Sequence, residues 1–213
     1  MELPHELLNK KAEQGSMRAV LLLLGEFSDQ DVEWMIIAGN SEAVEPGEIL
    51  IREGEKVDAL YVVLTGQFTV SISQSEADPM SQVYAALEGA VPQRELAKLS
   101  NGEVLGEMAF MDTRPHSTTI QAVENSLVLM IPRHKLMAKL AQDKDFAVRF
   151  YRALATVLTD KLRASVSRFR YGKGQSLSEL VEYEDELDAN TLEHLSLAGA
   201  RFDWLMKQVH QEI

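Results

Sequence analysis

Cysteine is absent from this 213-residue chain. Its absence excludes disulfide bonds, thiolate metal ligands and a thiol nucleophile, and it agrees with a reducing compartment. A long hydrophobic run is missing as well. The longest early apolar run, Ala19–Leu24, is far too short to cross a bilayer, and the N-terminal segment MELPHELLNKKAEQG lacks the pattern of a signal peptide. We therefore expect a soluble, cytoplasmic protein without a membrane span.

Positive charge is in short supply. The chain has 21 basic and 33 acidic side chains, a formal net charge of −12, so phosphate backbones repel it unless it has a separate basic patch. The clearest basic cluster runs from Lys161 to Lys173, and the tail after it is acidic. A DNA recognition helix needs basic and polar side chains. We therefore expect no sequence-specific DNA binding, and we interpret the cluster as a solvated face or a contact to the acidic tail.

Motifs for catalysis and for metal binding are not found. The sequence contains no G-x-S-x-G element, no P-loop and no G-x-G-x-x-G fingerprint. Four of the histidines are scattered without the spacing of a metal site: His5, His134, His194 and His210. The sequence therefore predicts a protein that is not an enzyme, with no catalytic residues, no metal and no cofactor.

Three short apolar runs after residue 45 predict β-strands: Ile49–Ile51, Leu60–Leu64 and Phe68–Ile72. In the third run apolar and polar residues alternate strictly, which is typical of a half-buried strand. Thr65-Gly66 separates the second and third runs and predicts a tight hairpin between them. Further strands are predicted at 95–99, 118–123 and 126–131. Short strands at close spacing with glycine turns indicate an antiparallel barrel or double sheet.

Helical patterns lie on both sides of these strands. Apolar spacing predicts helices at 5–24, from an N-cap at Ser28 to Gly39 or Asn40, at 133–142 and at 145–169. The fold class is α+β, an antiparallel β-roll flanked by helices. The expected parts are N-terminal helices at 1–42, a β-roll at 43–132 with an insertion at 74–93, C-terminal helices at 133–170, and an acidic linker with a terminal helix at 171–213. That terminal helix has an expected cap at Asn190 and an apolar side with Leu192, Leu195, Phe202, Leu205 and Val209.

The helix predicted at 145–169 carries one long apolar stripe. Its members are Val148, Tyr151, Leu154, Leu158, Leu162 and Val166. A long helix with such a stripe is often a dimer helix, which would make the protein a homodimer. The same pattern also fits a helix that lies on its own barrel, so both interpretations stay open at this point.

The most informative segment is GEMAFMDTRPHSTT, residues 106–119. Gly106 permits a close backbone approach, and the carboxylate of Glu107 can accept hydrogen bonds from sugar hydroxyls. The residues after Glu107 could begin a short helical turn whose N–H groups face an anion. The segment therefore predicts a pocket for a sugar and a phosphate, built largely from backbone. Its candidate ligand-binding residues are Gly106, Glu107, Met108, Ala109, His116, Ser117 and Thr118.

This segment resembles the phosphate-binding cassette of the cyclic nucleotide-binding domain family. The family includes bacterial catabolite activator proteins, regulatory subunits of cyclic AMP-dependent kinase, and cyclic nucleotide-gated channels. Its cassette reads roughly G-E-[LM]-A, a few apolar residues, a short loop and R-[AST]-[AST]-[TS]; residues 106–109 match the front half and 117–119 the tail. The resemblance extends through PGEILIREGEKVDALYVVLTGQFTV (46–70) and covers roughly residues 18–168. It implies a β-roll of the cyclic nucleotide-binding type, here without a helix-turn-helix domain.

One position departs from the family pattern. The family places an arginine immediately before the small residues, where it clamps the cyclic phosphate, and this chain has His116 there. A histidine is shorter, has fewer donors and is charged only part of the time near neutral pH. Loss of the arginine's charge-assisted bonds costs about 1.5–3 kcal/mol, or about one to two decades in affinity. Arg114 could swing in as a substitute, although aligning it with the family arginine would put Pro115 where the family has a small residue with an N–H.

By resemblance, Glu107 accepts a hydrogen bond from the ribose 2′-hydroxyl, and backbone N–H groups near Ala109 and Thr118 contact phosphate oxygens. The family takes base contacts from the helix after the barrel, here Lys161, Leu162 or Ser165. We therefore expect a regulatory module that binds cyclic AMP or a related nucleotide at 106–119, relays binding to helix 145–169 and acts on a partner protein. The alternative, which His116 keeps open, is a degenerate β-roll that binds no ligand and serves as a protein–protein interaction module.

Overall fold

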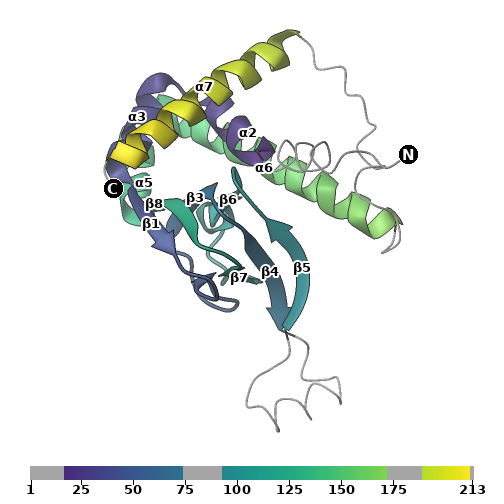
Figure 1. The fold of residues 1–213 in the computed structure, drawn as a ribbon. Helices are drawn as coiled ribbons and strands as arrows, with labels where there is room; N and C mark the ends of the chain where they lie inside the picture. The colour runs from purple at the N-terminus through teal and green to yellow at the C-terminus, as the bar shows by residue number, and fades with distance from the viewer. Residues whose placement is uncertain (1–16, 74–92, 172–188, 212–213) are drawn as a thin grey trace, which may run out of the picture. The chain divides into compact units, whose positions relative to one another are not determined.

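The computed structural model describes residues 17–73, 93–171 and 189–211. The chain forms two units, a β-roll unit (residues 1–17 and 38–135) and a helical unit (residues 18–37 and 136–213). Within the described part of the β-roll unit, two four-stranded sheets are built entirely from antiparallel pairs (Figure 1). The predicted fold class, an antiparallel β-roll with flanking helices, is confirmed.

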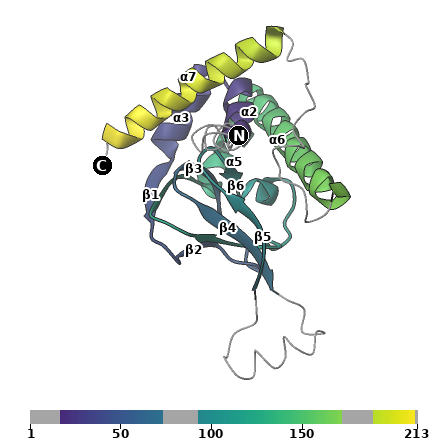
Figure 2. The same ribbon diagram turned by 45° about the vertical axis from the view of Figure 1, so that its right-hand side comes forward.

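Successive strands lie in different sheets, except for β4 and β5, which lie in the same sheet and pair with each other. One sheet has the order β1 (Asn40–Val44), β8 (Ser126–Pro132), β3 (Ala59–Thr65) and β6 (Val104–Leu105). The other has the order β2 (Ile49–Ile51), β7 (Thr119–Ala122), β4 (Phe68–Ser73) and β5 (Gln93–Leu99). Figure 2 labels β2, β4 and β5 of this sheet. Apolar side chains from both sheets form one core, which contains Val44, Ile51, Val63, Phe68, Ile120, Ala122 and Val128. Burial of these side chains on the inner faces is the main stabilising term of the roll.

All six strands predicted from the sequence are present, and their ends agree with the prediction to within two residues. The sequence missed β1 and β6. β1 has the sequence NSEAV, which has no apolar alternation, and it is a strand because all five residues pair with β8. It begins inside the segment that the sequence assigned to N-terminal helices. β6 is two residues long and pairs with Tyr61 and Val62, too short a run to be recognised by periodicity.

The predicted hairpin at Thr65-Gly66 is wrong. β3 pairs with β6 and β8, whereas β4 pairs with β5 and β7, so Gly66 turns a corner from one sheet to the other. Gly66 has φ +103°, and an added Cβ would overlap the side chain and backbone of Ser126 at the start of β8. A tight turn between two apolar runs has the same sequence signature in a hairpin and in such a corner. The pairing of the strands with distant partners decides between them.

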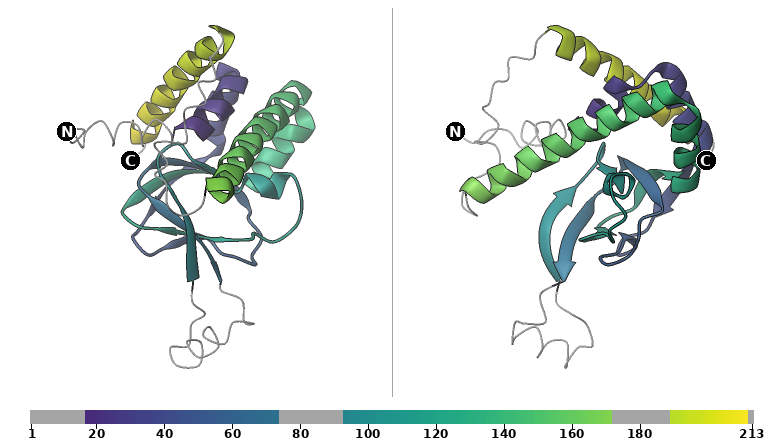
Figure 3. Two further views of the ribbon diagram at one scale, coloured as in Figure 1. Left: turned by 90° about the vertical axis from the view of Figure 1, so that its right-hand side faces the viewer. Right: turned by 180° about the vertical axis from the view of Figure 1, so that it is seen from behind.

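The helical unit contains α2 (Arg18–Glu26), most of α3 (Asp29–Ala38) and of α5 (Arg133–Gln142), α6 (Lys144–Tyr171) and α7 (Ala189–Gln211). Within this unit α2 lies between α6 and α7 (Figure 3). Aromatic rings of Phe27, Trp34, Phe146 and Phe150 pack together with centroid separations of 5.5 to 6.4 Å. None of the described helices is both long and apolar enough to span a membrane.

The helices predicted at 133–142 and 145–169 are confirmed as α5 and α6. Ser28 is the N-cap of α3 as predicted: its Oγ accepts from Asp31 N at 3.3 Å, and the Asp31 carboxylate accepts from Ser28 N at 2.8 Å. This reciprocal pair is a capping box. Phe202, Leu205 and Val209 are buried on α7. The predicted helix before residue 17, nearly all of the insertion at 74–93, most of the acidic linker and the side chain of Asn190 lie outside the described residues.

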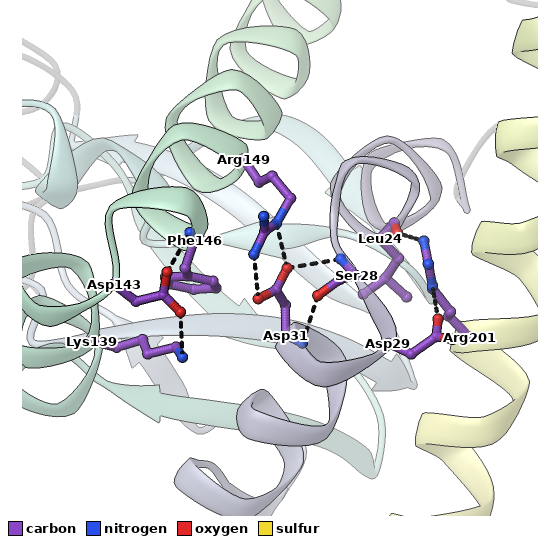
Figure 4. Close-up of polar contacts among 9 residues, drawn as sticks. All are labelled: Leu24, Ser28, Asp29, Asp31, Lys139, Asp143, Phe146, Arg149 and Arg201. Atoms are coloured by element: carbon purple, nitrogen blue, oxygen red, sulfur yellow. Dashed lines mark hydrogen bonds and ion pairs between the residues drawn. The ribbon is translucent and has the colours of Figure 1, made fainter.

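Asp31 also joins α3 to α6 by an ion pair (Figure 4). Its carboxylate accepts from Arg149 Nε at 2.6 Å and from Arg149 Nη2 at 3.0 Å, and its side chain is only 3% exposed. Burial acts to raise the pKa of Asp31, but the hydrogen bonds from Arg149 and Ser28 outweigh burial and hold that pKa below its ordinary value. The carboxylate therefore stays ionised and holds two helices of the unit together.

The apolar stripe predicted on α6 is mostly exposed. Val148, Tyr151, Leu162 and Val166 are 40 to 68% exposed, and only Leu154 of the predicted set is buried. The buried face of α6 instead includes Phe146, Phe150, Ala153, Leu154 and Val157. The helix therefore has two apolar faces, and periodicity alone does not say which of them packs within the chain.

Candidate ligand site at residues 106–119

A left-handed glycine begins the site. Gly106 has φ +77° and ψ +3°, and it precedes the 3₁₀ turn η1 (Glu107–Phe110) directly after β6. An added Cβ at Gly106 would overlap the carbonyl oxygen of Ala59 and crowd Cγ1 of Val57. The backbone of β3 thus approaches the turn so closely that a side chain has no room. Glycine at this position follows from both the backbone angle and the close approach.

Glu107 is the first residue of η1 and is 6% exposed. Such burial is uncommon for a glutamate, and it fixes the place of the carboxylate. Ala109, two residues on, packs against the core of the roll, whereas Met108 is 47% exposed. The turn therefore presents a fixed carboxylate at its start, while its far end is anchored in the apolar core.

His116 is held by its backbone and by its ring. Its N–H donates to Glu55 O and its carbonyl accepts from Gly54 N, both at 2.8 Å, which fixes the chain against the β2–β3 connection. Nδ1 of the ring lies 2.8 Å from Thr118 O. A carbonyl oxygen can only accept, so this contact requires Nδ1 to carry a proton. In the neutral ring Nε2 is then an acceptor, and it becomes a donor only when the ring is charged.

The two backbone N–H groups that the resemblance assigns to phosphate make no strong hydrogen bond within the segment. Ala109 N donates to Gly106 O at 3.2 Å, the long end of the usual range, so this bond is weak. Thr118 N lies 3.4 Å from His116 Nδ1, which cannot accept a hydrogen bond while it carries the proton donated to Thr118 O. A phosphate oxygen could accept shorter, charge-assisted bonds from both N–H groups.

Arg114, the substitute clamp considered from the sequence, is paired with Asp112. Its backbone N–H and its guanidinium both donate to the Asp112 carboxylate, at 3.0 Å and at 2.7 to 2.8 Å, and the Arg114 side chain is 84% exposed. The backbone hydrogen bond, followed by the guanidinium, lowers the pKa of Asp112. Arg114 must give up this pair before it can reach a ligand.

Arg133, a residue that the sequence did not single out, contacts the other end of η1. Its Nη1 donates to Ala109 O at 2.6 Å, and its guanidinium carbon lies 5.3 Å from the centre of the Phe110 ring. Arg133 is the first residue of α5, and its backbone N–H donates to Asp58 O at 2.7 Å. The sequence gives little indication of this contact, because Pro132-Arg133 indicates only the end of a strand and the start of a helix.

A polar pocket of about 360 Å³ lies beside the last residue of the segment. Its lining includes Arg52, Thr69, Ser71, Glu95, Thr119 and Gln121. Ile120 and Ala122 point into the core, so Thr119 and Gln121 of the same strand face outward. The pocket is therefore a hollow on the outer face of the sheet and not a cavity within the roll. Strand periodicity could have predicted which residues face the pocket, but not its volume.

The β-roll segment matches a known protein family. Residues 41–143 match the profile of the family described as "Cyclic nucleotide-binding domain". These residues are a cyclic nucleotide-binding domain. The domain is similar to parts of two curated cGMP-dependent protein kinases. The one from Eimeria tenella is 30% identical over 95 residues, 45% of this chain and 8% of the kinase. The one from Toxoplasma gondii is 26% identical over 141 residues, 66% of this chain and 12% of the kinase. The chain thus spans about a tenth of the length of these relatives.

Solved structures support the fold of the cyclic nucleotide-binding domain. A cyclic nucleotide-binding domain from Methylobacillus flagellatus has a TM-score of 0.60 and 21% identity, over 76% of this chain and 86% of that one. The catabolite activator protein of Thermus thermophilus has a TM-score of 0.53 and 19% identity, over 90% and 87%. At this level of identity the likeness concerns the fold alone.

The cyclic nucleotide-binding domain contains all seven ligand-binding candidates, between β6 and β7. Their roles toward a ligand remain predictions. The residues named for base contacts, Lys161, Leu162 and Ser165, lie on α6 in the helical unit, and their role also remains a prediction.

Proposed function

We propose that this protein is a regulatory module that binds a cyclic mononucleotide at residues 106–119. The observation that carries the proposal is the buried Glu107 carboxylate at the start of a turn whose entry only a glycine permits. A fixed carboxylate suits the paired hydroxyls of a ribose or its 2′-hydroxyl. The named relatives are cGMP-dependent kinases, so cyclic GMP stands beside cyclic AMP as a candidate ligand.

Ligand binding would give the backbone N–H groups of the segment stronger acceptors. A phosphate oxygen would replace the 3.2 Å bond of Ala109 N and would accept from Thr118 N, which lies 3.4 Å from His116 Nδ1. Ser117, which is exposed, would offer its hydroxyl. The segment would shift, and α5 would carry the shift to α6. The output would be a change in the affinity for a partner protein, limited by the difference in ligand affinity between the two conformations.

Titration with cyclic AMP, cyclic GMP and cyclic dinucleotides, followed by calorimetry and thermal unfolding, tests the proposal. A ligand at 100 times its Kd should stabilise the fold by about 2.7 kcal/mol. Glu107→Gln keeps the size of the side chain but removes its charge, and we expect it to weaken binding at least about 10-fold. Glu124→Gln, on the exposed β7–β8 turn, is the matched control and should bind as wild type does. If neither wild type nor a His116→Arg variant binds any of these nucleotides, the result would favour the degenerate interaction module instead.

We also propose that α6 forms a homodimer. Val148, Tyr151, Ala155, Leu158 and Leu162 follow one another at alternating spacings of three and four residues, as in a coiled-coil seam. The first three and Leu162 are exposed in the single chain, and Leu158 is half-buried. A helix with a self-complementary stripe suits a second copy of itself.

Leu162→Glu would place a charge in this seam, at its last residue, and we expect it to convert the dimer to a monomer. Light scattering after size exclusion measures the mass directly. Ala164→Glu adds the same charge at an exposed position off the stripe and should leave the mass unchanged. A wild-type protein that is monomeric at concentrations of about 100 μM would contradict the dimer, because a useful coiled-coil interface binds more tightly than that.

A further inference from the structure

The first turn of α5 connects the candidate site to the helical unit. The chain passes from the β-roll unit to the helical unit between Lys135 and Leu136, inside α5. Arg133 begins this helix and makes three contacts on the roll: to Asp58 O, to Ala109 O and over the Phe110 ring. Two of the three contacts are to η1. The helix that leaves the roll is thus tied by its first side chain to the turn that starts at Glu107.

Glu107 and Arg133 contact opposite ends of one short element. Glu107 is the first residue of η1, and Ala109 and Phe110 are its last two. A four-residue 3₁₀ turn has no room to absorb a displacement internally, so a shift at one end moves the other. A guanidinium held by a charge-assisted hydrogen bond and by a ring face would follow that movement in position and in orientation.

Lys135 extends the connection to a second helix. Its Nζ donates to Ala38 O at 2.9 Å, the last residue of α3, where the chain again passes between the units. The first turn of α5 therefore bonds to η1 through Arg133 and to the end of α3 through Lys135. Movement of this turn would reach both α3 and the remainder of α5.

We propose that Arg133 is the positioning residue that transmits ligand binding from η1 to the helical unit. The inference rests on the proposed nucleotide binding at 106–119. The side-chain contacts of Arg133, in addition to the continuity of the chain, then couple η1 to the helical unit. Arg133 needs no contact with the ligand, so its loss should reduce transmission more than affinity.

The two tryptophans provide the readout. Trp34 on α3 and Trp204 on α7 are the only tryptophans of the chain, and both belong to the helical unit. Trp34 packs on Phe146, with 5.5 Å between ring centroids. A change of tryptophan emission on ligand binding therefore reports on the helical unit, while calorimetry reports binding itself.

The experiment compares wild type, Arg133→Gln, Arg133→Lys and His134→Gln in the full chain, titrated with cyclic AMP and cyclic GMP. We expect Arg133→Gln to bind with an affinity within about 10-fold of wild type but to lose at least about half of the emission change at saturation. Arg133→Lys keeps the positive charge but lacks the planar guanidinium, so its emission change should lie between those of wild type and Arg133→Gln. His134→Gln changes the next residue, which is exposed, and should behave as wild type does. Thermal unfolding without ligand checks that each variant is folded.

The possible failures are distinguishable. Absence of calorimetric binding in wild type overturns the proposed function. Binding by wild type without an emission change overturns transmission to the helical unit. A full emission change in Arg133→Gln at saturation overturns the role of Arg133 alone. If Arg133→Gln does not fold, the comparison of Arg133→Lys with His134→Gln decides, and an undiminished change in Arg133→Lys counts against the proposal.

Discussion

A His116→Arg variant is expected to bind cyclic nucleotide about 10- to 100-fold more tightly than wild type. The backbone at this position is fixed by two hydrogen bonds of 2.8 Å to Gly54 and Glu55, so an arginine would start from a defined point. Its guanidinium is always charged and can hold a phosphate with two parallel bonds, which accounts for about 1.5–3 kcal/mol. Calorimetric titration of both proteins with cyclic AMP and cyclic GMP measures the difference.

A neutral variant at the same position controls for the charge of the guanidinium. In wild type, Nδ1 of His116 is committed to Thr118 O, so only Nε2 of the ring remains for a phosphate. His116→Gln places a neutral amide there and should bind no more tightly than wild type. Equal affinities of wild type and His116→Arg would show that residue 116 does not contact the ligand.

Replacing Asp31 with alanine is expected to lower the free energy of unfolding by about 2–4 kcal/mol. The substitution leaves Arg149 without its bidentate partner and removes the acceptor of Ser28 N at the start of α3. Removing one partner of a buried ion pair is costly because the remaining charge keeps its desolvation penalty. Loss of the helix cap lowers the free energy of unfolding further. Urea unfolding of both proteins at pH 7 measures the difference.

Acid should reduce this difference. The folded pKa of Asp31 is lowered, so its contribution is fully present above the unfolded pKa of about 3.9 and is lost as the pH falls through the folded pKa. The gap between wild type and Asp31→Ala should be constant from pH 7 to about 5 and should shrink below about 4. Asp29→Ala is the matched control. Asp29 lies in the first turn of α3 with Asp31 and also forms an ion pair, with Arg201, but its side chain is 82% exposed. It should cost less than about 1 kcal/mol. A gap that does not change with acid would mean that capping and packing, and not ionisation, account for the effect of Asp31.

Most of the roll was predictable because its strands carry their own pattern. Phe68, Val70 and Ile72 alternate with polar residues, and the structure has β4 there. Ser28 was identified as a cap because capping is decided within four residues of chain. β1 and β6 were missed for the opposite reason, since neither has periodicity and both are strands through pairing with distant segments. Thr65-Gly66 has the signature of a hairpin and forms a corner instead.

The sequence by itself determined the candidate site, because a contiguous run from Gly106 to Thr119 carries its glycine, carboxylate and hydroxyls in fixed order. Only the tertiary structure decided what surrounds them. It placed Ala59 against Gly106, turned Nδ1 of His116 onto Thr118 O, paired Arg114 with Asp112 and brought Arg133 to Ala109. It also decided which of the two apolar faces of α6 is buried. The physical reason is range: backbone angles, caps and strand alternation are set by neighbours along the chain, whereas close approaches, ion pairs and the choice between two apolar faces depend on residues that only folding brings together.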